Sequence, residues 1–241
     1  IYDSDDSLSA IKRTIKSLNF SKKDALGPSL LRYYISKIKS GLITVDDLVD
    51  VEKLEVVRAV AEEYEKELAR NNAFDFDDLI LKPVQLWSRN EMILQKYQDR
   101  YRYVLVDEFQ DVNTAQYEFV RLLAQNHRNI NVVGDDAQAI YGFRSANYKH
   151  FLNFEHDWPE TKVIFLEENY RSTGNILSAA NAIIQNNKSQ KPKNLWTKKE
   201  KGAPIAIHEH EDEVAEAEWV ASEVELRIKN NELRNKPEVG L

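Results

Sequence analysis

Two acidic side chains, Asp107 and Glu108, stand directly after an apolar run at residues 103–106. Unbroken apolarity of this kind is typical of a buried parallel strand. In open α/β sheets, ligands bind beyond the carboxyl ends of the strands. Asp107 could therefore hold a magnesium ion, often through water, and Glu108 could deprotonate a water that attacks the γ-phosphate of a nucleotide. The alternative is a solvated strand end, because acidic pairs also occur at the starts of loops.

A second strand is predicted at residues 130–133, and Gln138 follows shortly after its end. If the two strands are neighbours, Gln138 lies close to Asp107 and Glu108. Its amide can donate a hydrogen bond to a phosphate oxygen and accept one from water. This combination suits a sensor of the γ-phosphate.

The next loop carries Tyr141, Phe143 and Arg144. Two aromatic rings and a guanidinium on one loop can stack on bases and contact phosphates. From this loop alone, the favoured interpretation is instead that both rings are buried in the core beneath the loop.

Arg171 stands between a third predicted strand at residues 162–166 and a predicted helix at residues 175–186. The helix dipole disfavours a cation at the start of a helix. An anion such as a phosphate, reached across a domain cleft, would explain the arginine better. A salt bridge to Glu167 or Glu168 is the alternative explanation.

The elements that must position these residues follow two patterns. Apolar residues recur at helical spacing through the first seventy or so residues, with a long helix expected at 45–71 and a carboxylate cap at Asp3–Asp6 for the first helix. From Phe74 onward, short apolar runs alternate with helical patterns. The further elements expected there are helices at 114–125, 148–154 and 213–229 and a strand at 204–208. This alternation predicts an α/β fold with parallel strands.

Composition narrows the class of protein. The 241 residues carry a net charge of −7, so any contact with nucleic acid must be local. The chain contains no cysteine, which excludes disulfides and thiolate zinc sites and fits a cytosolic protein. Apolar runs of about eighteen residues are absent, so no membrane span is expected. The chain starts at Ile1 without a signal-peptide pattern, and we interpret it as a segment of a longer protein.

Taken together, these residues resemble the UvrD/Rep family of superfamily 1 DNA helicases. The matching stretches are residues 74–80 (FDFDDLI), 106–111 (VDEFQD), 134–146 (GDDAQAIYGFRSA) and 168–173 (ENYRST), and residues 191–197 (KPKNLWT) are also similar. The likeness runs from Ile1 to about residue 229. It implies an α/β fold of incomplete RecA-like, parallel-sheet P-loop NTPase domains with an all-helical insertion.

The resemblance implies three parts. Residues 1–73 would be the helical insertion of the first motor half. Residues 74–163 would complete the first RecA-like domain, and residues 164–241 would begin the second. A nucleotide would bind between the two RecA-like domains.

The resemblance also implies roles at the nucleotide. Asp107 looks like the magnesium-binding acid of the Walker B motif, and Glu108 like the catalytic base for ATP hydrolysis. Gln138 matches the glutamine that contacts the γ-phosphate. Arg171 matches an arginine finger from the second motor domain, and Tyr170 an aromatic residue that stacks on adenine.

For DNA, Phe76, Tyr141 and Phe143 match aromatic residues that line the path of a single strand. Arg144 matches an arginine of the same loop, which could serve either DNA or the acidic site. Two positions depart from the family pattern. Phe143 stands where many relatives have tryptophan, and Ser145 where glycine is usual.

The expected activity is therefore ATP-dependent, Mg²⁺-dependent helicase action with 3′ to 5′ movement on single-stranded and partially duplex DNA. We expect a cytoplasmic location without a membrane, and repair or replication accessory proteins are candidate partners. The chain contains no G-x-x-x-x-G-K-[ST] phosphate-binding loop. Residues 1–241 alone are therefore expected to be inactive.

Two other functions compete with this one. The first is a non-catalytic, nucleic-acid-binding relative of the helicases that lacks ATPase activity. The second is a metal-dependent nuclease built on five acidic residues. These are Asp75, Asp77, Asp78, Asp107 and Glu108. The first three also fit a helix N-terminus, where carboxylates are favoured.

Overall fold

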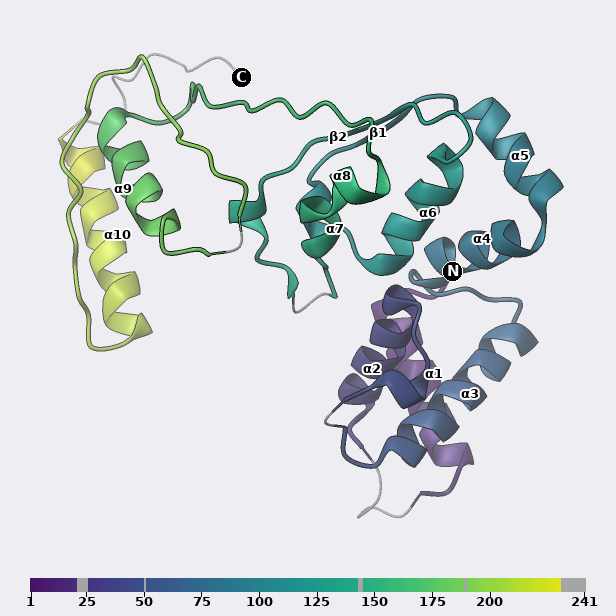
Figure 1. The fold of residues 1–241 in the computed structure, drawn as a ribbon. Helices are drawn as coiled ribbons and strands as arrows, with labels where there is room; N and C mark the ends of the chain where they lie inside the picture. The colour runs from purple at the N-terminus through teal and green to yellow at the C-terminus, as the bar shows by residue number, and fades with distance from the viewer. Residues whose placement is uncertain (21–25, 50, 143–144, 189, 231–241) are drawn as a thin grey trace. The chain divides into compact units, whose positions relative to one another are not determined.

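The computed structural model describes residues 1–20, 26–49, 51–142, 145–188 and 190–230 (Figure 1). The chain divides into two compact units. The first comprises residues 1–164 and 187–192, and the second comprises residues 165–186 together with the chain from Lys193 onward. Each unit is described by itself below.

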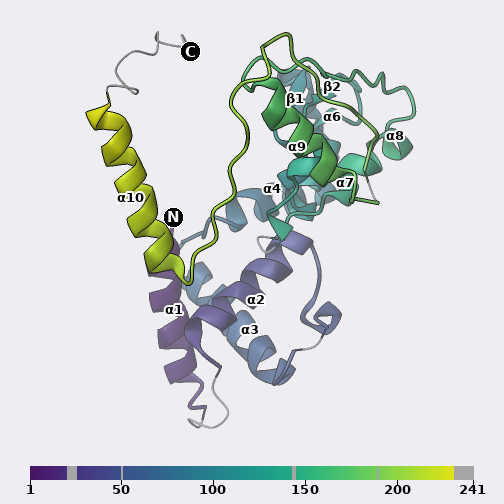
Figure 2. The ribbon, with the colours of Figure 1, turned by 90° about the vertical axis from the view of Figure 1, so that its left-hand side faces the viewer.

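The first unit begins with a three-helix part. It consists of α1 (Ser4–Ser17), α2 (Pro28–Gly41) and α3 (Leu54–Arg70). The three helices pack against one another and lie side by side in both views (Figures 1 and 2). Their apolar faces form one core. Its fully or almost fully buried members include Ile11, Leu31, Ile35, Val57, Val60, Tyr64 and Leu68.

The predicted cap of α1 is confirmed. The carboxylate of Asp3 accepts hydrogen bonds from the backbone N–H groups of Asp5 at 2.8 Å and Asp6 at 2.9 Å. These bonds satisfy two donors that the first turn of a helix leaves free.

The prediction of one helix at 45–71 is wrong in its first part. A short 3₁₀ helix, η1 (Val45–Asp47), comes first, and α3 starts only at Leu54. Thr44 and Asp47 hydrogen-bond locally, with Thr44 N–H donating to Asp47 Oδ2 at 2.7 Å. Such side-chain bonds compete with helix formation. Lys53 then adopts a left-handed backbone with φ 57°, which separates the two elements.

The remainder of the first unit contains both helices and strands. In chain order it has α4 (Asp78–Arg89), α5 (Glu91–Arg100), β1 (Val104–Val106), η2 (Phe109–Asp111), α6 (Thr114–Ala124), β2 (Ile130–Val132), η3 (Asp136–Gln138), α7 (Lys149–Leu152) and α8 (Phe154–Asp157). The strands β1 and β2 pair in parallel, and α6 contacts β1 (Figure 1). A second core lies here. It includes Trp87, Leu94, Phe109, Leu122, Phe154 and Trp158.

The parallel pairing confirms the α/β class and both of the first two predicted strands. The predicted helix at 148–154 is instead two short helices, α7 and α8, which are separated at Asn153. Phe154 turns into the second core, where it is buried.

The second unit contains α9 (Gly174–Ile184) and α10 (Glu213–Lys229), close to the predicted bounds. Two other predictions are wrong, because residues 162–166 and 204–208 do not form strands. A strand needs a hydrogen-bonded neighbour. Among the described residues, the only pairing near these segments is an isolated bridge between Glu168 and Trp196.

Candidate functional site

The ends of β1 and β2 meet at one edge of the small sheet. Val106 is the register partner of Val132 in the parallel pair. The pairing continues past the strands, since Val133 N–H donates to Val106 O at 2.8 Å and Phe109 N–H donates to Val133 O at 2.9 Å. The two strands are thus neighbours. This was the condition under which Gln138 was expected to lie close to Asp107 and Glu108.

The acidic pair lies exposed at this edge. One oxygen of Asp107 accepts the backbone N–H of Glu108 at 2.9 Å. Glu108 itself has a left-handed backbone, with φ 49°. This conformation is uncommon for a residue with a side chain and costs roughly 1 kcal/mol or more. Asp107 and Glu108 both line a pocket of about 370 Å³ that also reaches Val106 and Asp111.

Gln110 connects the two strand ends, and the sequence interpretation assigned it no role. Its side chain is buried, with 1% exposed. Its Nε2 donates to Glu108 Oε2 at 2.8 Å, and its Oε1 accepts the backbone N–H of Asp135 at 2.9 Å. The only sequence signal for it is its position in the stretch 106–111.

Gly134 makes room for this link. A Cβ atom built on Gly134 would lie 2.7 Å from Gln110 Oε1 and 3.1 Å from a ring carbon of Phe151. The first contact is closer than real Cβ atoms approach, and the second is tight enough that Phe151 would have to shift slightly. The glycine at the end of β2 therefore permits the close approach of Gln110.

Gln138 lies at the end of η3 and is exposed. Its Nε2 donates to Asp135 Oδ2 at 2.8 Å. Gln138 is not among the residues that line the pocket beside Asp107 and Glu108. Its amide is held by Asp135 in this structure, and its approach to Asp107 and Glu108 stays a prediction.

The aromatic loop is described only in part, because Phe143 and Arg144 lie outside the described residues. Tyr141 is 37% exposed, so it is not one of the buried core aromatics. Backbone bonds close the loop around it, from Ser145 N–H to Gly142 O at 3.1 Å and from Ala146 N–H to Tyr141 O at 3.4 Å.

Phe76 projects from the turn before α4 and is 59% exposed. It lines a second pocket of about 380 Å³ together with Arg32, Tyr33 and Ser145, among other residues. The fold of the first unit therefore brings the aromatic-loop residue Ser145 and the distant Phe76 to one depression.

The neighbouring acids do not support the nuclease hypothesis. Asp75 and Asp78 are buried and form ion pairs with Lys39. Burial raises the pKa of Asp77, which a hydrogen bond from Ser36 opposes. In the described part of the chain, no group of three or more histidine, cysteine or acidic side chains is arranged to hold a metal ion. The acids at 75–78 and those at 107–108 thus do not form one cluster.

In the second unit, Asn169 shapes the segment that carries Tyr170 and Arg171. Its Oδ1 accepts the backbone N–H groups of Arg171 at 3.0 Å and Ser172 at 2.7 Å. Tyr170 is 75% exposed, and its hydroxyl donates to Glu168 Oε2 at 3.0 Å. This hydrogen bond raises the pKa of Tyr170.

Arg171 is exposed. Glu168 pairs instead with Lys198, at 3.0 Å. Within the described ranges, no ion pair joins Arg171 to Glu167 or Glu168, so the salt-bridge explanation is not supported. Arg171 belongs to the second unit and Asp107 to the first. Their convergence on one nucleotide stays a prediction.

None of the helices in the described part of the chain has both the length and the apolarity that crossing a bilayer requires.

Comparison with protein families identifies the class. The family model for the UvrD/REP helicase N-terminal domain matches residues 1–159, and the model for the UvrD-like helicase C-terminal domain matches residues 164–239. The first match covers more than half of the chain. The chain therefore belongs to the UvrD/Rep-like helicase family.

Within that family, it is similar to proteins named ATP-dependent DNA helicase PcrA. It is 44% identical over 227 residues to the protein of Staphylococcus epidermidis (strain ATCC 12228 / FDA PCI 1200), covering 93% of this chain and 31% of the relative. It is 42% identical over 234 residues to that of Staphylococcus aureus (strain NCTC 8325 / PS 47), covering 95% and 32%. The chain spans about a third of the length of these relatives.

Proposed function

We propose that this chain is part of an ATP-dependent DNA helicase that couples ATP hydrolysis to movement on single-stranded DNA and to unwinding of duplex DNA. Its family membership and its similarity to the PcrA helicases support this proposal. The geometric observation that carries it is the parallel pairing of β1 and β2, because this pairing brings the ends of both strands to one edge.

The proposed organisation has three parts. Residues 1–73 form a helical insertion, residues 74–163 form part of a first RecA-like P-loop NTPase domain, and residues 164–241 begin a second. Two separate hydrophobic cores within the first unit support the boundary near residue 73. The division of the chain near residue 164 supports the second boundary.

In the proposed reaction, Glu108 accepts a proton from water as the water oxygen bonds to the γ-phosphorus of ATP. The bond from that phosphorus to the β–γ bridging oxygen breaks, and ADP leaves. The hydrogen bond from Gln110 would orient the carboxylate of Glu108. Gln138 would contact the γ-phosphate, Arg171 would stabilise its developing charge, and Tyr170 would stack on adenine.

Asp107 would hold the magnesium ion. Its exposed carboxylate at a strand end suits Mg²⁺, which commonly takes one or two protein carboxylates together with phosphate oxygens and water. When bound, Mg²⁺ would neutralise charge on the phosphates.

On the DNA side, we assign Phe76, Tyr141 and Phe143 to stacking on the bases of a single strand, and Arg144 to binding the same strand. The exposure of Phe76 and Tyr141 supports this assignment. The substrates would be single-stranded and partially duplex DNA. The 3′ to 5′ direction, the cytoplasmic location and any accessory proteins are carried over from the family resemblance.

The direct test is Glu108→Gln in the full-length protein. We expect kcat for DNA-stimulated ATP hydrolysis to fall by about 10²- to 10⁴-fold, because the amide cannot accept the proton. ATP affinity, measured by calorimetry, should stay within a few fold of wild type. Glu91→Gln, at an exposed position on α5, is the matched control and should leave both unchanged.

Near-wild-type turnover by Glu108→Gln would show that the base lies elsewhere. The non-catalytic alternative makes a different prediction. A full-length wild-type protein that binds single-stranded DNA but turns over no ATP would support it.

A further inference from the structure

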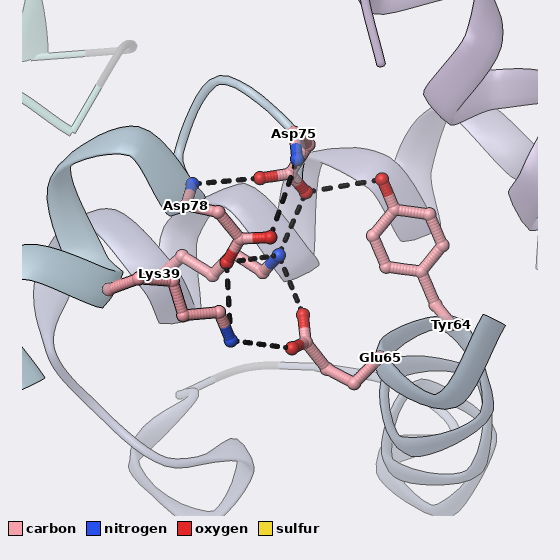
Figure 3. Close-up of polar contacts among 6 residues, drawn as sticks. Lys39, Tyr64, Glu65, Asp75 and Asp78 are labelled. Atoms are coloured by element: carbon pink, nitrogen blue, oxygen red, sulfur yellow. Dashed lines mark hydrogen bonds and ion pairs between the residues drawn. The ribbon is translucent and has the colours of Figure 1, made fainter. Parts of the chain in front are cut away.

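A buried ion cluster joins the three-helix part to the start of α4 (Figure 3). It is formed by Lys39, Tyr64, Glu65, Asp75 and Asp78, and is called the Lys39 cluster. At its more exposed side, Lys82 lies 3.0 Å from Glu65 Oε2 and 3.5 Å from Asp78 Oδ1. The Nζ atom of Lys39 lies 2.6 Å from Glu65 Oε1, 2.8 Å from Asp75 Oδ2 and 3.1 Å from Asp78 Oδ1. The hydroxyl of Tyr64 donates to Asp75 Oδ2 at 3.1 Å.

The groups of the cluster depend on one another electrostatically. The side chain of Lys39 is only 4% exposed and that of Asp78 only 1%. Burial by itself lowers the pKa of Lys39, but Asp75 and Glu65 more than compensate, and the net pKa is raised. Lys39 is therefore charged at neutral pH. Since an unpaired buried charge is strongly unfavourable, Lys39 holds the two aspartates in place.

The two aspartates in turn fix the backbone around Phe76. Asp78 N–H donates to Asp75 Oδ1 at 2.9 Å, and Asp75 N–H donates to Asp78 Oδ2 at 3.3 Å. These reciprocal bonds join a residue before Phe76 to a residue after it. On the preceding side, Tyr2 N–H donates to Phe74 O at 2.7 Å.

Phe76 contributes little to either core, because 59% of it is exposed. Asp75 and Asp78 could start α4 by capping alone, without a buried lysine. Lys39 adds an ion pair that connects α2 to the turn 75–78. This turn carries the exposed ring of Phe76, which lines the second pocket. A ring that is fixed before binding loses less conformational entropy when a base stacks on it.

We infer that Lys39 is a positioning residue for single-stranded DNA binding, and that it acts through the turn that carries Phe76. This inference rests on the proposed contact between Phe76 and DNA. Lys39 is buried and touches no DNA itself. Its charge holds the turn 75–78 in the conformation in which Phe76 can stack on a base.

A double-mutant cycle in the full-length protein tests this inference. The cycle compares wild type, Phe76→Ala, Lys39→Met and the double variant, by fluorescence anisotropy with fluorescein-labelled oligo-dT. Phe76→Ala should weaken binding by about tenfold, as expected for the loss of one stacked base. Lys39→Met should weaken binding by roughly fivefold in the wild-type background and have no further effect in the Phe76→Ala background.

ATP turnover gives a second readout. Lys39→Met should raise the DNA concentration for half-maximal stimulation by a similar factor, roughly fivefold, with the maximal rate at saturating DNA kept. Lys37→Met removes the same charge from the same helix and is the matched control. If Lys39→Met does not fold, Tyr64→Phe in the same cycle replaces it, since it removes only the hydroxyl bonded to Asp75. The expected loss is then about threefold.

The outcomes separate this inference from the proposed function. Unchanged affinity in Phe76→Ala would disprove the DNA contact of Phe76, and the inference would fall with it. If Phe76→Ala weakens binding but Lys39→Met and Tyr64→Phe do not, the contact stands and the role of Lys39 is disproved. Equal losses in both backgrounds would mean that Lys39 supports folding generally, and would also disprove the inference.

Discussion

Gln110 illustrates how a single buried amide can organise a site at the residue scale. It donates to Glu108 from one strand end and accepts from Asp135 at the other. The left-handed backbone of Glu108 turns the chain sharply after β1. The proposed catalytic carboxylate therefore has a hydrogen-bond partner supplied by its own strand end.

The space that Gly134 leaves for Gln110 gives a prediction at this scale. In the full-length protein, Gly134→Ala would place a methyl group 2.7 Å from Gln110 Oε1. Displacing the buried amide should cost about 1–3 kcal/mol of stability and lower the rate of ATP hydrolysis. Differential scanning fluorimetry and a phosphate-release assay measure the two effects.

The matched control is Gly27→Ala, where the added methyl group meets nothing within 4 Å. We expect a small change in melting temperature there and none in ATP hydrolysis. Equal melting temperatures and rates for Gly134→Ala and wild type would show that the link through Gln110 is not required.

At the scale of elements, α6 and α8 are joined by a polar contact inside an aromatic cluster. The hydroxyl of Tyr117 on α6 donates a hydrogen bond to Asp157 on α8. His150 stacks on the Tyr117 ring, with centroids 4.4 Å apart. This contact attaches the two short helices after the sheet to the longer helix α6.

The contact predicts a dependence of stability on pH. The hydrogen bond from Tyr117 lowers the pKa of Asp157 below its usual value, and burial only partly opposes it. The stability that this bond contributes is therefore present above the ordinary aspartate pKa of about 4. It is lost as the pH falls through the lowered pKa of Asp157.

Tyr117→Phe removes the bond, so the full-length variant should melt below wild type at pH 7. The difference in melting temperature should shrink at pH 3. His156, which lies 3.1 Å from Asp157, is present in both proteins, so its protonation largely cancels in the comparison. A difference in melting temperature that stays constant from pH 7 to pH 3 would contradict this assignment.

At the scale of the whole molecule, the chain spans about a third of the length of its PcrA relatives. Apolar side chains on the faces of the small sheet are exposed, including Leu105 on β1, where helices would cover a complete parallel sheet. We expect the full-length protein to add strands to this sheet and helices over its faces, since a two-stranded sheet alone is only marginally stable.

This leads to a prediction about residues 1–241 prepared alone. They contain no phosphate-binding loop of the P-loop type, so we expect no ATP hydrolysis above background with or without oligo-dT. A phosphate-release assay with the full-length protein as the positive control measures this. Robust DNA-stimulated turnover by residues 1–241 would contradict the proposed division of the site.

The sequence by itself determined the class of protein and the elements that rest on local signals. The ordered motifs indicated the helicase family. Helical periodicity placed α1, α9 and α10, and a polar cap marked the start of α1, because both signals depend on neighbours only a few residues apart. Short unbroken apolar runs, which are also a local signal, predicted β1 and β2.

Only the tertiary structure decided the contacts between distant segments. The strands expected at 162–166 and 204–208 have no pairing partner among the described residues, and strand formation depends on pairing that no local pattern encodes. Lys39 meets Asp75 only because the helices fold over the turn, and Gln110 reaches Asp135 only because the strands pair. A residue's chemistry is read from its type, but its partners are set by packing across the chain.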